Sequence, residues 1–185
     1  NMSYILKVYD DNTMYNDLRN LILDSIIDDK NQAAGNMVRL SETLSRFNLF
    51  NLVYDGDKPI ACGGLYISDF DPRFAFIGVR SYVLPEYKQK RIIKNYILTA
   101  HKQWAIKNKI KAIGMSFNDY NKNLIKLWSK PRLGMPAECL PQHLFYSNFN
   151  IVPFPVNIRE TKQYVAYENL DSWEYDWNKL RWPDS

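Results

Sequence analysis

The sequence predicts a mixed α/β (α+β) fold with a mostly antiparallel central sheet of six to seven strands, one parallel pair and about four flanking helices. Three observations predict it. Segments with the alternation or apolar runs of strands lie at about 3–9, 50–54, 59–67, 74–83, 110–117, 144–152 and 162–168. An Asp-Gly turn at 55–58 predicts a hairpin, because these residues readily adopt positive φ. The strand, helix and strand over 74–117 imply a parallel pair joined by a right-handed crossover.

The chain before the hairpin predicts one strand and two helices. Ser3–Tyr9 alternates apolar and polar residues. Asn12 or Thr13 is the expected cap of a helix that runs to about Ile27. Its expected apolar face consists of Tyr15, Leu18, Leu21, Ile22 and Ile26. A second helix is expected over Met37–Phe47.

After the hairpin, Phe74–Val83 is expected to complete a three-strand meander. The next helix, Arg91–Asn108, has an expected inner face of Ile93, Ile97, Ala100 and Trp104. A further helix is expected over Asn121–Ser129. The tail, 171–185, has Trp173, Trp177 and Leu180 at helical spacing, so it predicts a short helix that seals the core or supports a homodimer. No repeat or linker interrupts the chain, which predicts one domain over 1–185.

Composition excludes several classes of protein. The chain has 185 residues and is 46% hydrophobic, enough for a substantial core, and no apolar run approaches the length that a bilayer requires. No signal peptide is recognisable. Two cysteines, Cys62 and Cys139, predict neither a disulfide framework nor a metal site. The expectation is a cytoplasmic protein without a membrane partner or a metal.

Charge is distributed unevenly along the chain. Residues 88–132 contain 12 Lys and Arg but one acid, Asp119, so this segment carries +11 and the remainder −7. This asymmetry favours an anionic ligand at one site and a cationic one at another. Nucleic acid is a disfavoured alternative, because aromatic residues are only modestly interleaved with the basic ones and several of them are expected to be buried.

The most informative stretch is 82–94, where a strand passes through Pro85 into a basic turn and directly into a helix. Backbone N–H groups converge at a helix N-terminus, and the helix dipole favours negative charge there. Lys88, Lys90, Arg91 and Lys94 add full positive charges. The pattern predicts a site for a phosphorylated ligand, against the alternative of an ordinary solvated helix start.

The order of elements and two motifs resemble the GCN5-related N-acetyltransferase (GNAT) family. Residues 83–93, VLPEYKQKRII, follow the register V-x-P-x-[YH]-[RQ]-x-x-G-x-[GA], and residues 121–130, NKNLIKLWSK, follow N-x-x-A-x-x-L-Y-x-K. The resemblance covers about residues 3–130. Arg91 and Ile93 stand at the two glycine positions, although helical backbone angles would suit both. Trp128 replaces a tyrosine that often serves as the general acid, and an indole does not release a proton near neutral pH.

The resemblance implies a bound acetyl-CoA between two parallel strands that splay apart. The backbone at Tyr82 and Val83 would meet the pantetheine and the thioester carbonyl. The pyrophosphate would bind the basic turn, and the pantetheine arm would contact Asn121 and the neighbourhood of Trp128. The implied pyrophosphate ligands are the backbone or side chains of Lys88, Gln89, Lys90, Arg91, Ile92, Ile93 and Lys94.

Candidates for the proton-transfer groups are less distinct. Asp119 follows a strand near the expected cleft, and Tyr82 is either structural or part of the cleft. Asp69, Asp71 and Glu86 are expected to serve turns or the surface. His101 is expected at the surface of its helix, and His143 is a further candidate for the cleft. A water relay would serve equally, because the base needs only to bring the amine to its neutral form.

Two functions follow from these expectations. One is an N-acetyltransferase that transfers the acetyl group of acetyl-CoA to a primary amine, namely a small amine, a polyamine or a peptide amine, by direct attack in a ternary complex. The alternative is a catalytically inactive GNAT-like module that binds acyl-CoA or a protein. Arg91, Ile93 and Trp128 motivate the alternative.

Overall fold

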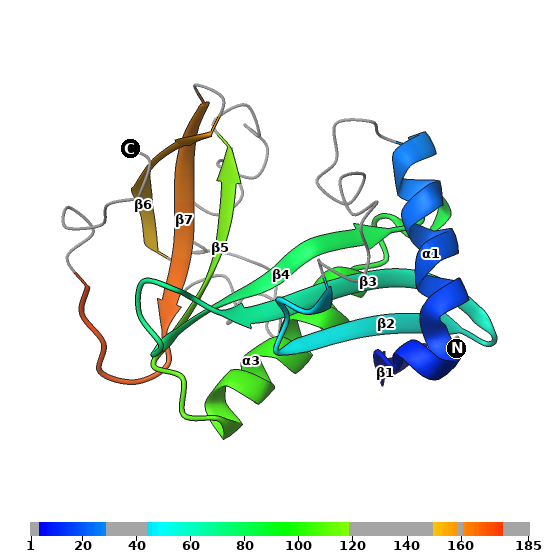
Figure 1. Ribbon diagram of the computed structural model, residues 1–185, viewed down its shortest axis with the longest axis horizontal. Coiled ribbons are helices and arrows are strands. Elements are labelled where there is room, and N and C mark those ends of the chain that lie inside the picture. The colour runs from blue at the N-terminus through cyan, green and yellow to red at the C-terminus, as the bar shows by residue number, and fades with distance from the viewer. Residues whose placement is uncertain (1–3, 29–43, 119–149, 159–160, 176–185) are drawn as a thin grey trace. The chain divides into compact units, whose positions relative to one another are not determined.

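The computed structural model describes residues 4–28, 44–118, 150–158 and 161–175. These residues form a seven-stranded sheet with the order β1-β2-β3-β4-β5-β7-β6 (Figure 1). The strands are β1 (Ile5–Val8), β2 (Leu49–Asp55), β3 (Lys58–Ile67), β4 (Phe74–Val83), β5 (Ala112–Asn118), β6 (Asn150–Ile158) and β7 (Thr161–Asn169). The helices are α1 (Asp11–Asp28), the 3₁₀ turn η2 (Pro85–Tyr87), the π-helical segment η3 (Ile93–Leu98) and α3 (Thr99–Lys107). The predicted mixed fold with one parallel pair is confirmed.

The chain divides into two compact units. Unit 1 comprises Asn1–Ile67 and Ile77–Trp104, and unit 2 comprises Ser68–Phe76 and Ala105–Ser185. Strand β4 therefore begins in unit 2 and ends in unit 1. The single domain expected over 1–185 stays a prediction.

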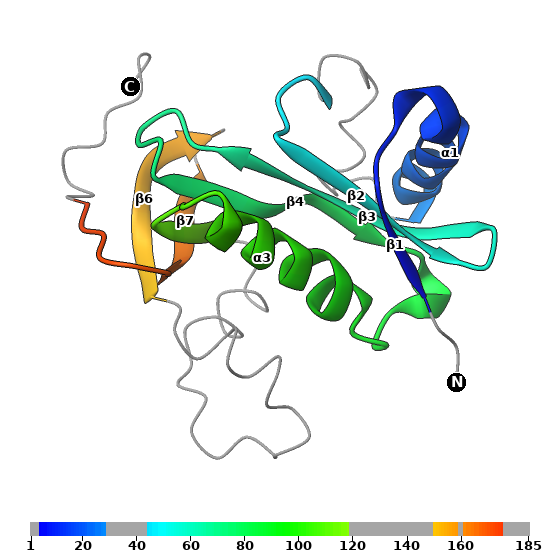
Figure 2. The same ribbon diagram turned by 90° about the horizontal axis from the view of Figure 1, so that it is seen from below.

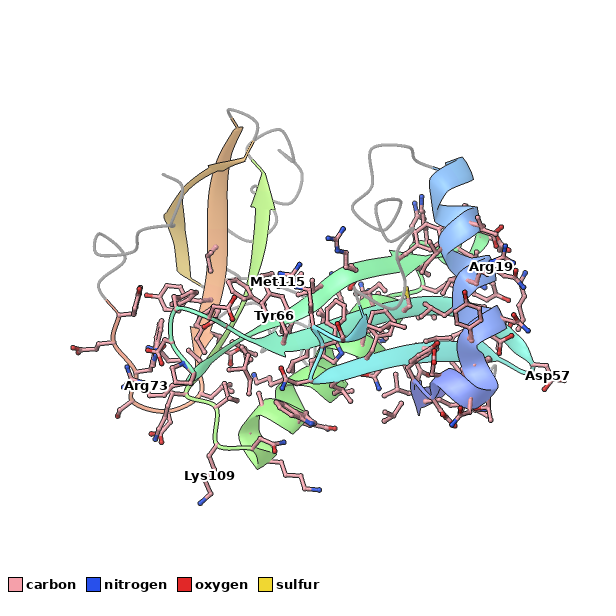
Figure 3. All side chains as sticks on the ribbon, in the orientation of Figure 1. Arg19, Asp57, Tyr66, Arg73, Lys109 and Met115 are labelled. Carbon is pink, nitrogen blue, oxygen red and sulfur yellow. The ribbon has the colours of Figure 1, made fainter. Side chains whose placement is uncertain are left out.

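In unit 1, β1, β2 and β3 pair in antiparallel order. The predicted hairpin joins β2 to β3, with Gly56 at φ +60° as the turn chemistry requires. Figure 3 shows Asp57 at the tip of this hairpin. Helix α1 covers one face of these strands, and the helix that follows β4 covers the other (Figure 2). The basic turn therefore lies in the loop that carries the chain from the sheet into one of its covering helices.

The cap of helix α1 lies two to three residues before the expected caps. Asp10 is the capping residue, since its carboxylate accepts hydrogen bonds from the Asn12 N–H at 3.1 Å and from the Thr13 hydroxyl at 3.1 Å. Asn12 and Thr13 were the wrong caps because both are already helical. The buried face contains Met14, Leu18, Leu21 and Ile22, whereas Tyr15 is exposed.

The helix after β4 contains an extra residue that shifts its inner face. Ile92, Ile97 and His101 are buried, so the first two are five residues apart and the next two are four apart. A π-helical turn produces this spacing because it adds one residue to the helical repeat. The expected placement of His101 at the surface is wrong: the residue follows the buried Ile97 by one α-helical turn and is itself 0% exposed.

In unit 2, the first residues of β4 pair in parallel with β5, and β5, β7 and β6 continue in antiparallel order (Figure 1). The parallel register joins Phe74 to Ala112 and Phe76 to Gly114. Strand β7 matches its prediction closely. Strand β6 includes residues 150–152 of the strand expected over 144–152 and ends later, at Ile158, whereas residues 144–149 lie outside the described part of the chain.

The start of the tail packs onto unit 2 without forming a helix. Residues 171–175 have no helical hydrogen-bond pattern. Trp173 is buried and donates its indole N–H to the Asp71 carboxylate at 3.1 Å. Its burial agrees with the expected sealing role, which stays a prediction for the tail as a whole, because Trp177 and Leu180 lie outside the described residues. The predicted helices over 121–129 and most of 37–47 also lie outside them.

Candidate functional site

The basic turn follows β4 and begins with the 3₁₀ turn η2, whose first residue is Pro85. Tyr87 N–H donates to the Leu84 carbonyl at 2.9 Å, and Lys88 N–H to the Pro85 carbonyl at 3.2 Å. Lys90 N–H donates to the Tyr87 carbonyl at 3.3 Å, so the turn uses this amide for its own closure. Helical structure begins at Ile92, where the first amides of a helix have no acceptor within it.

Two residues of the turn adopt left-handed backbone angles. Gln89 has φ +72° and Arg91 has φ +57°. The expectation of helical angles at Arg91 is wrong. Arg91 occupies the first glycine position of the resembled motif, and a residue with a Cβ costs about 1–2 kcal/mol in this conformation. The structure thus retains the backbone shape for which glycine is suited, with a guanidinium group added.

Cationic side chains lie exposed along this turn. Lys88, Lys90 and Arg91 are exposed, and Lys94 is half-buried in the first helical turn. The Lys90 ammonium lies 5.2 Å from the centroid of the Tyr87 ring. Of the two apolar members of the predicted ligand set, Ile92 is buried and Ile93 half-buried, so only their backbone is suited to a phosphate.

Two side chains at the end of the β2–β3 hairpin contact the basic turn. Tyr87 donates its phenolic hydrogen to Asp55 Oδ2 at 2.6 Å, which raises the pKa of Tyr87 to about 12. The Lys58 ammonium forms an exposed ion pair with Glu86 at 3.0 Å. The pKa of Glu86 is lowered mainly by a hydrogen bond from its own backbone N–H and next by its bond with Lys58. The expected surface role of Glu86 is confirmed.

Strand β4 has a kink just before the residues expected at the thioester. Gly78 has φ +60° and Arg80 has φ +57°, and the Ser81 hydroxyl donates to the Gly78 carbonyl at 2.6 Å. Cys62, in β3, directs its thiol at the Arg80 carbonyl at 3.8 Å. Burial raises the pKa of Cys62 to about 12, so this group remains a protonated donor.

The backbone beyond the kink alternates between two edges. Leu84 N–H donates to the Ile60 carbonyl of β3 at 2.9 Å. Because successive residues of a strand direct their N–H groups to opposite edges, Val83 N–H is directed away from β3. The Tyr82 N–H is directed to the same edge as the Leu84 N–H, and the Tyr82 side chain is buried in the core of unit 1. Val83 is accordingly the better placed of the two backbone candidates.

Sequence reasoning missed the side chains that shape this region, namely Asn51, Cys62, Ser81, His101 and the Asp55–Tyr87 pair. Gly78 was an available signal, because an isolated glycine within a strand often marks a bulge. Asn51, a polar residue within an apolar strand, was another.

The remaining candidates have different outcomes. Asp119, Asn121, Trp128 and His143 lie outside the described residues, so their roles stay predictions. Asp69 is exposed. Asp71 is buried rather than superficial, and it stabilises its turn by accepting from the Arg73 backbone at 2.8 Å and from the guanidinium at 2.7 Å.

Within the described ranges, no group of His, Cys, Asp or Glu side chains has an arrangement that could hold a metal ion. The helices of the same ranges include none with the length and apolar character needed to cross a membrane.

Comparison with solved structures finds acetyltransferases. A GNAT-family acetyltransferase from Staphylococcus aureus Mu50 is similar with a TM-score of 0.59 and 16% identity, over 91% of this chain and 100% of that one. The ribosomal-protein-S5-alanine acetyltransferase of Vibrio fischeri has a TM-score of 0.59 and 13% identity, over 93% and 96%. The ribosomal-protein-S18-alanine N-acetyltransferase of Escherichia coli has a TM-score of 0.55 and 10% identity, over 97% and 100%.

No model of a known protein family matches the chain, and no curated protein sequence matches it. The likeness to solved structures, which extends over nearly the whole chain, shows that this protein has the fold of the GNAT acetyltransferases. The resemblance of the chain to the GNAT family is confirmed at the level of the fold.

Proposed function

We propose that this protein is an N-acetyltransferase that transfers the acetyl group of acetyl-CoA to a primary amine. The observation that carries the proposal is the exposed cationic turn between the kinked strand β4 and the helix that follows it. Acetyl-CoA is an anion with a pyrophosphate, and a charge-assisted hydrogen bond to such a group contributes about 1.5–3 kcal/mol. Lys88, Arg91 and Lys94 are the side chains proposed to bind it.

The proposed reaction is direct attack in a ternary complex. The amine nitrogen bonds to the acetyl carbonyl carbon, the carbon–sulfur bond breaks, coenzyme A leaves as the thiolate, and the amine releases a proton. Val83 N–H is the proposed donor to the thioester oxygen, on which negative charge develops. A donor of this kind contributes a factor of about 10²–10³ to the rate. Asp119 is the proposed proton-transfer group, with a water relay as its alternative, whereas the burial of the Tyr82 side chain in the core of unit 1 favours the structural reading of that residue.

The acceptor is proposed to be a small amine, a polyamine or a peptide amine. The acidic balance of the chain outside 88–132 supports a cationic acceptor. Two similar structures bear the names of ribosomal-protein-alanine acetyltransferases, which makes a peptide with an N-terminal alanine a sensible member of the first panel.

Isothermal titration of acetyl-CoA into wild-type protein and an Arg91→Glu variant tests the site. Lys107→Glu is the matched control, since it makes the same charge change at the last residue of α3. We expect Arg91→Glu to abolish binding and Lys107→Glu to preserve it. Release of free thiol in the presence of an amine panel then tests catalysis. Absence of acetyl-CoA binding in the wild type would contradict the proposal.

A non-catalytic acyl-CoA-binding module is the second candidate. The left-handed conformation of Arg91 favours it, because a Cβ at this position obstructs the close backbone approach that glycine allows. Tight binding of acetyl-CoA without thiol release from any amine of the panel would support this candidate over the first.

A further inference from the structure

A buried histidine in unit 1 holds the kink of β4. His101 Nδ1 accepts the Gly78 N–H at 3.1 Å, and His101 Nε2 lies 3.0 Å from Asn51 Oδ1. Asn51 in turn donates to the Lys7 carbonyl at 3.3 Å. The side chains are 0% exposed at His101 and 2% at Asn51. A chain of hydrogen bonds therefore runs from β1 through β2 and the covering helix to the kinked backbone.

These bonds define the tautomer of the ring. A backbone N–H can only donate, so Nδ1 of His101 must be the acceptor. The hydrogen then resides on Nε2, which donates to the oxygen of the Asn51 amide. Burial lowers the pKa of His101 to about 3, so the ring is neutral at physiological pH. Its charge state agrees with the role that the geometry requires.

The kink determines which backbone N–H groups are directed to the edge of β4 that faces away from β3. A residue gained or lost within a strand exchanges the edges to which all later N–H groups are directed. If the backbone at Gly78 and Arg80 relaxed to regular strand angles, the directions of Tyr82 and Val83 would change. Three side chains prevent this, because His101 binds the Gly78 N–H, Ser81 binds the Gly78 carbonyl and Cys62 binds the Arg80 carbonyl.

We propose that His101 is a positioning residue, whose hydrogen bond to Gly78 fixes the kink of β4 and thereby directs the Val83 N–H toward the acetyl-CoA thioester. The inference rests on the proposed acetyl-CoA site. A purely space-filling role does not account for the contacts, because burying an imidazole costs free energy unless both nitrogens are hydrogen-bonded. An apolar residue would fill the same volume without that requirement.

Two substitutions separate the bond to Gly78 from the bond to Asn51. In His101→Asn, the amide oxygen takes the place of Nδ1 and retains the acceptor for Gly78 N–H. In His101→Gln, the longer amide reaches the place of Nε2 and retains the donor to Asn51, while Gly78 N–H loses its acceptor. Both variants lose one buried hydrogen bond, so they are matched in their expected loss of thermal stability.

We expect His101→Asn to bind acetyl-CoA with a dissociation constant within about threefold of the wild type, and His101→Gln about tenfold more weakly. Isothermal titration and melting curves measure the two effects separately. Equal binding by His101→Gln and wild type would overturn the positioning role and leave the proposed function intact. Absence of binding by the wild type would overturn both.

The wild-type protein provides a measurement that needs no variant to fold. In an NMR titration with acetyl-CoA, we expect the amide signals of Gly78 and Val83 and the ring nitrogens of His101 to shift with a common dissociation constant. A shift at Val83 alone, with Gly78 and His101 unmoved, would overturn the coupling between the kink and the site.

Discussion

The phenolic hydroxyl of Tyr87 and the carboxylate of Asp55 lie 2.6 Å apart and join the basic turn to the end of β2. Tyr87 is buried beneath the turn, and the ammonium groups of Lys90 and Lys58 lie 5.2 Å and 5.7 Å from the centroid of its ring. A turn that has to present several like charges to one ligand benefits from a rigid base, because ordering its side chains on binding has an entropic cost. This pair supplies that base from a residue 32 positions earlier in the chain.

Tyr87→Phe tests the role of this base. The substitution removes one hydroxyl and leaves the Asp55 carboxylate in place. We expect the dissociation constant for acetyl-CoA to rise about three- to tenfold, as the loss of one hydrogen bond predicts. Tyr15→Phe, which removes an exposed hydroxyl from α1, is the control and should bind as the wild type does. Unchanged binding by Tyr87→Phe would show that the turn is rigid without this bond.

The left-handed backbone conformation of Arg91 should be detectable from the stability of two substitutions at this position. Arg91→Gly and Arg91→Ala remove the same charge, but only glycine is relaxed at φ +57°. We expect the glycine variant to be more stable than the alanine variant by about 1 kcal/mol in chemical denaturation. Both should bind acetyl-CoA more weakly than the wild type. An alanine variant as stable as the glycine variant would contradict the left-handed assignment.

The burial of neutral His101 should make the folded protein less stable in mild acid. Its pKa is about 3 in the folded protein and about 6.5 when unfolded, so between these values the unfolded chain binds one more proton. The contribution of this group is complete above about pH 6.5 and declines by about 1.4 kcal/mol per pH unit below it. Chemical denaturation between pH 7 and 5 measures the slope. His101→Asn should remove this component, and an unchanged slope in that variant would contradict the prediction.

Asp71 should contribute to the stability of unit 2. It accepts hydrogen bonds from Arg73 and from the indole of Trp173, and the Arg73 guanidinium is the main cause of its lowered pKa. We expect Asp71→Asn to reduce the free energy of unfolding by about 1–3 kcal/mol. Because the pKa of Asp71 is lowered on folding, its contribution is present above its unfolded pKa and declines as the pH falls below it. Asp69→Asn, at an exposed neighbour, should have little effect.

Gly63 should tolerate no side chain. A Cβ at this position of β3 would lie 2.7 Å from Ile97 Cγ2 and 2.8 Å from Ser81 Oγ. We expect Gly63→Ala to lower the free energy of unfolding by about 1–3 kcal/mol, because Ile97 of the helix and Ser81 of the kinked strand would have to move away from β3. The exposed substitution Asn95→Ala is the control. A stable alanine variant with unchanged acetyl-CoA binding would contradict the close approach of β3 to the kink.

Much of the fold could be predicted because its signals are local. The bounds of β4 were predicted to the residue, and the hairpin followed from an Asp-Gly turn between two apolar runs. The basic turn was also visible, since its charges and the helix start are adjacent in the chain. The cap of α1 was misplaced by two to three residues and the end of β6 by six, and the ends of elements are where local patterns discriminate least.

The errors at the site have a physical origin in the tertiary structure. Arg91 was expected in a helical conformation, because no local pattern reports that the turn requires a left-handed residue. His101 was expected at the surface, because its hydrogen-bond partners, the Gly78 N–H and the Asn51 side chain, are distant in the chain and no local pattern reports them.

The order of the elements, the class of fold and the place of the cationic turn follow from local signals, because periodicity, turn chemistry and charge act between neighbouring residues. The orientation of the backbone in β4 follows from tertiary packing alone. That orientation depends on hydrogen bonds between groups far apart in the chain, such as His101 and Asn51, which are separated by 50 residues. Such bonds form only when the strand, the kink and the shifted helix are packed together.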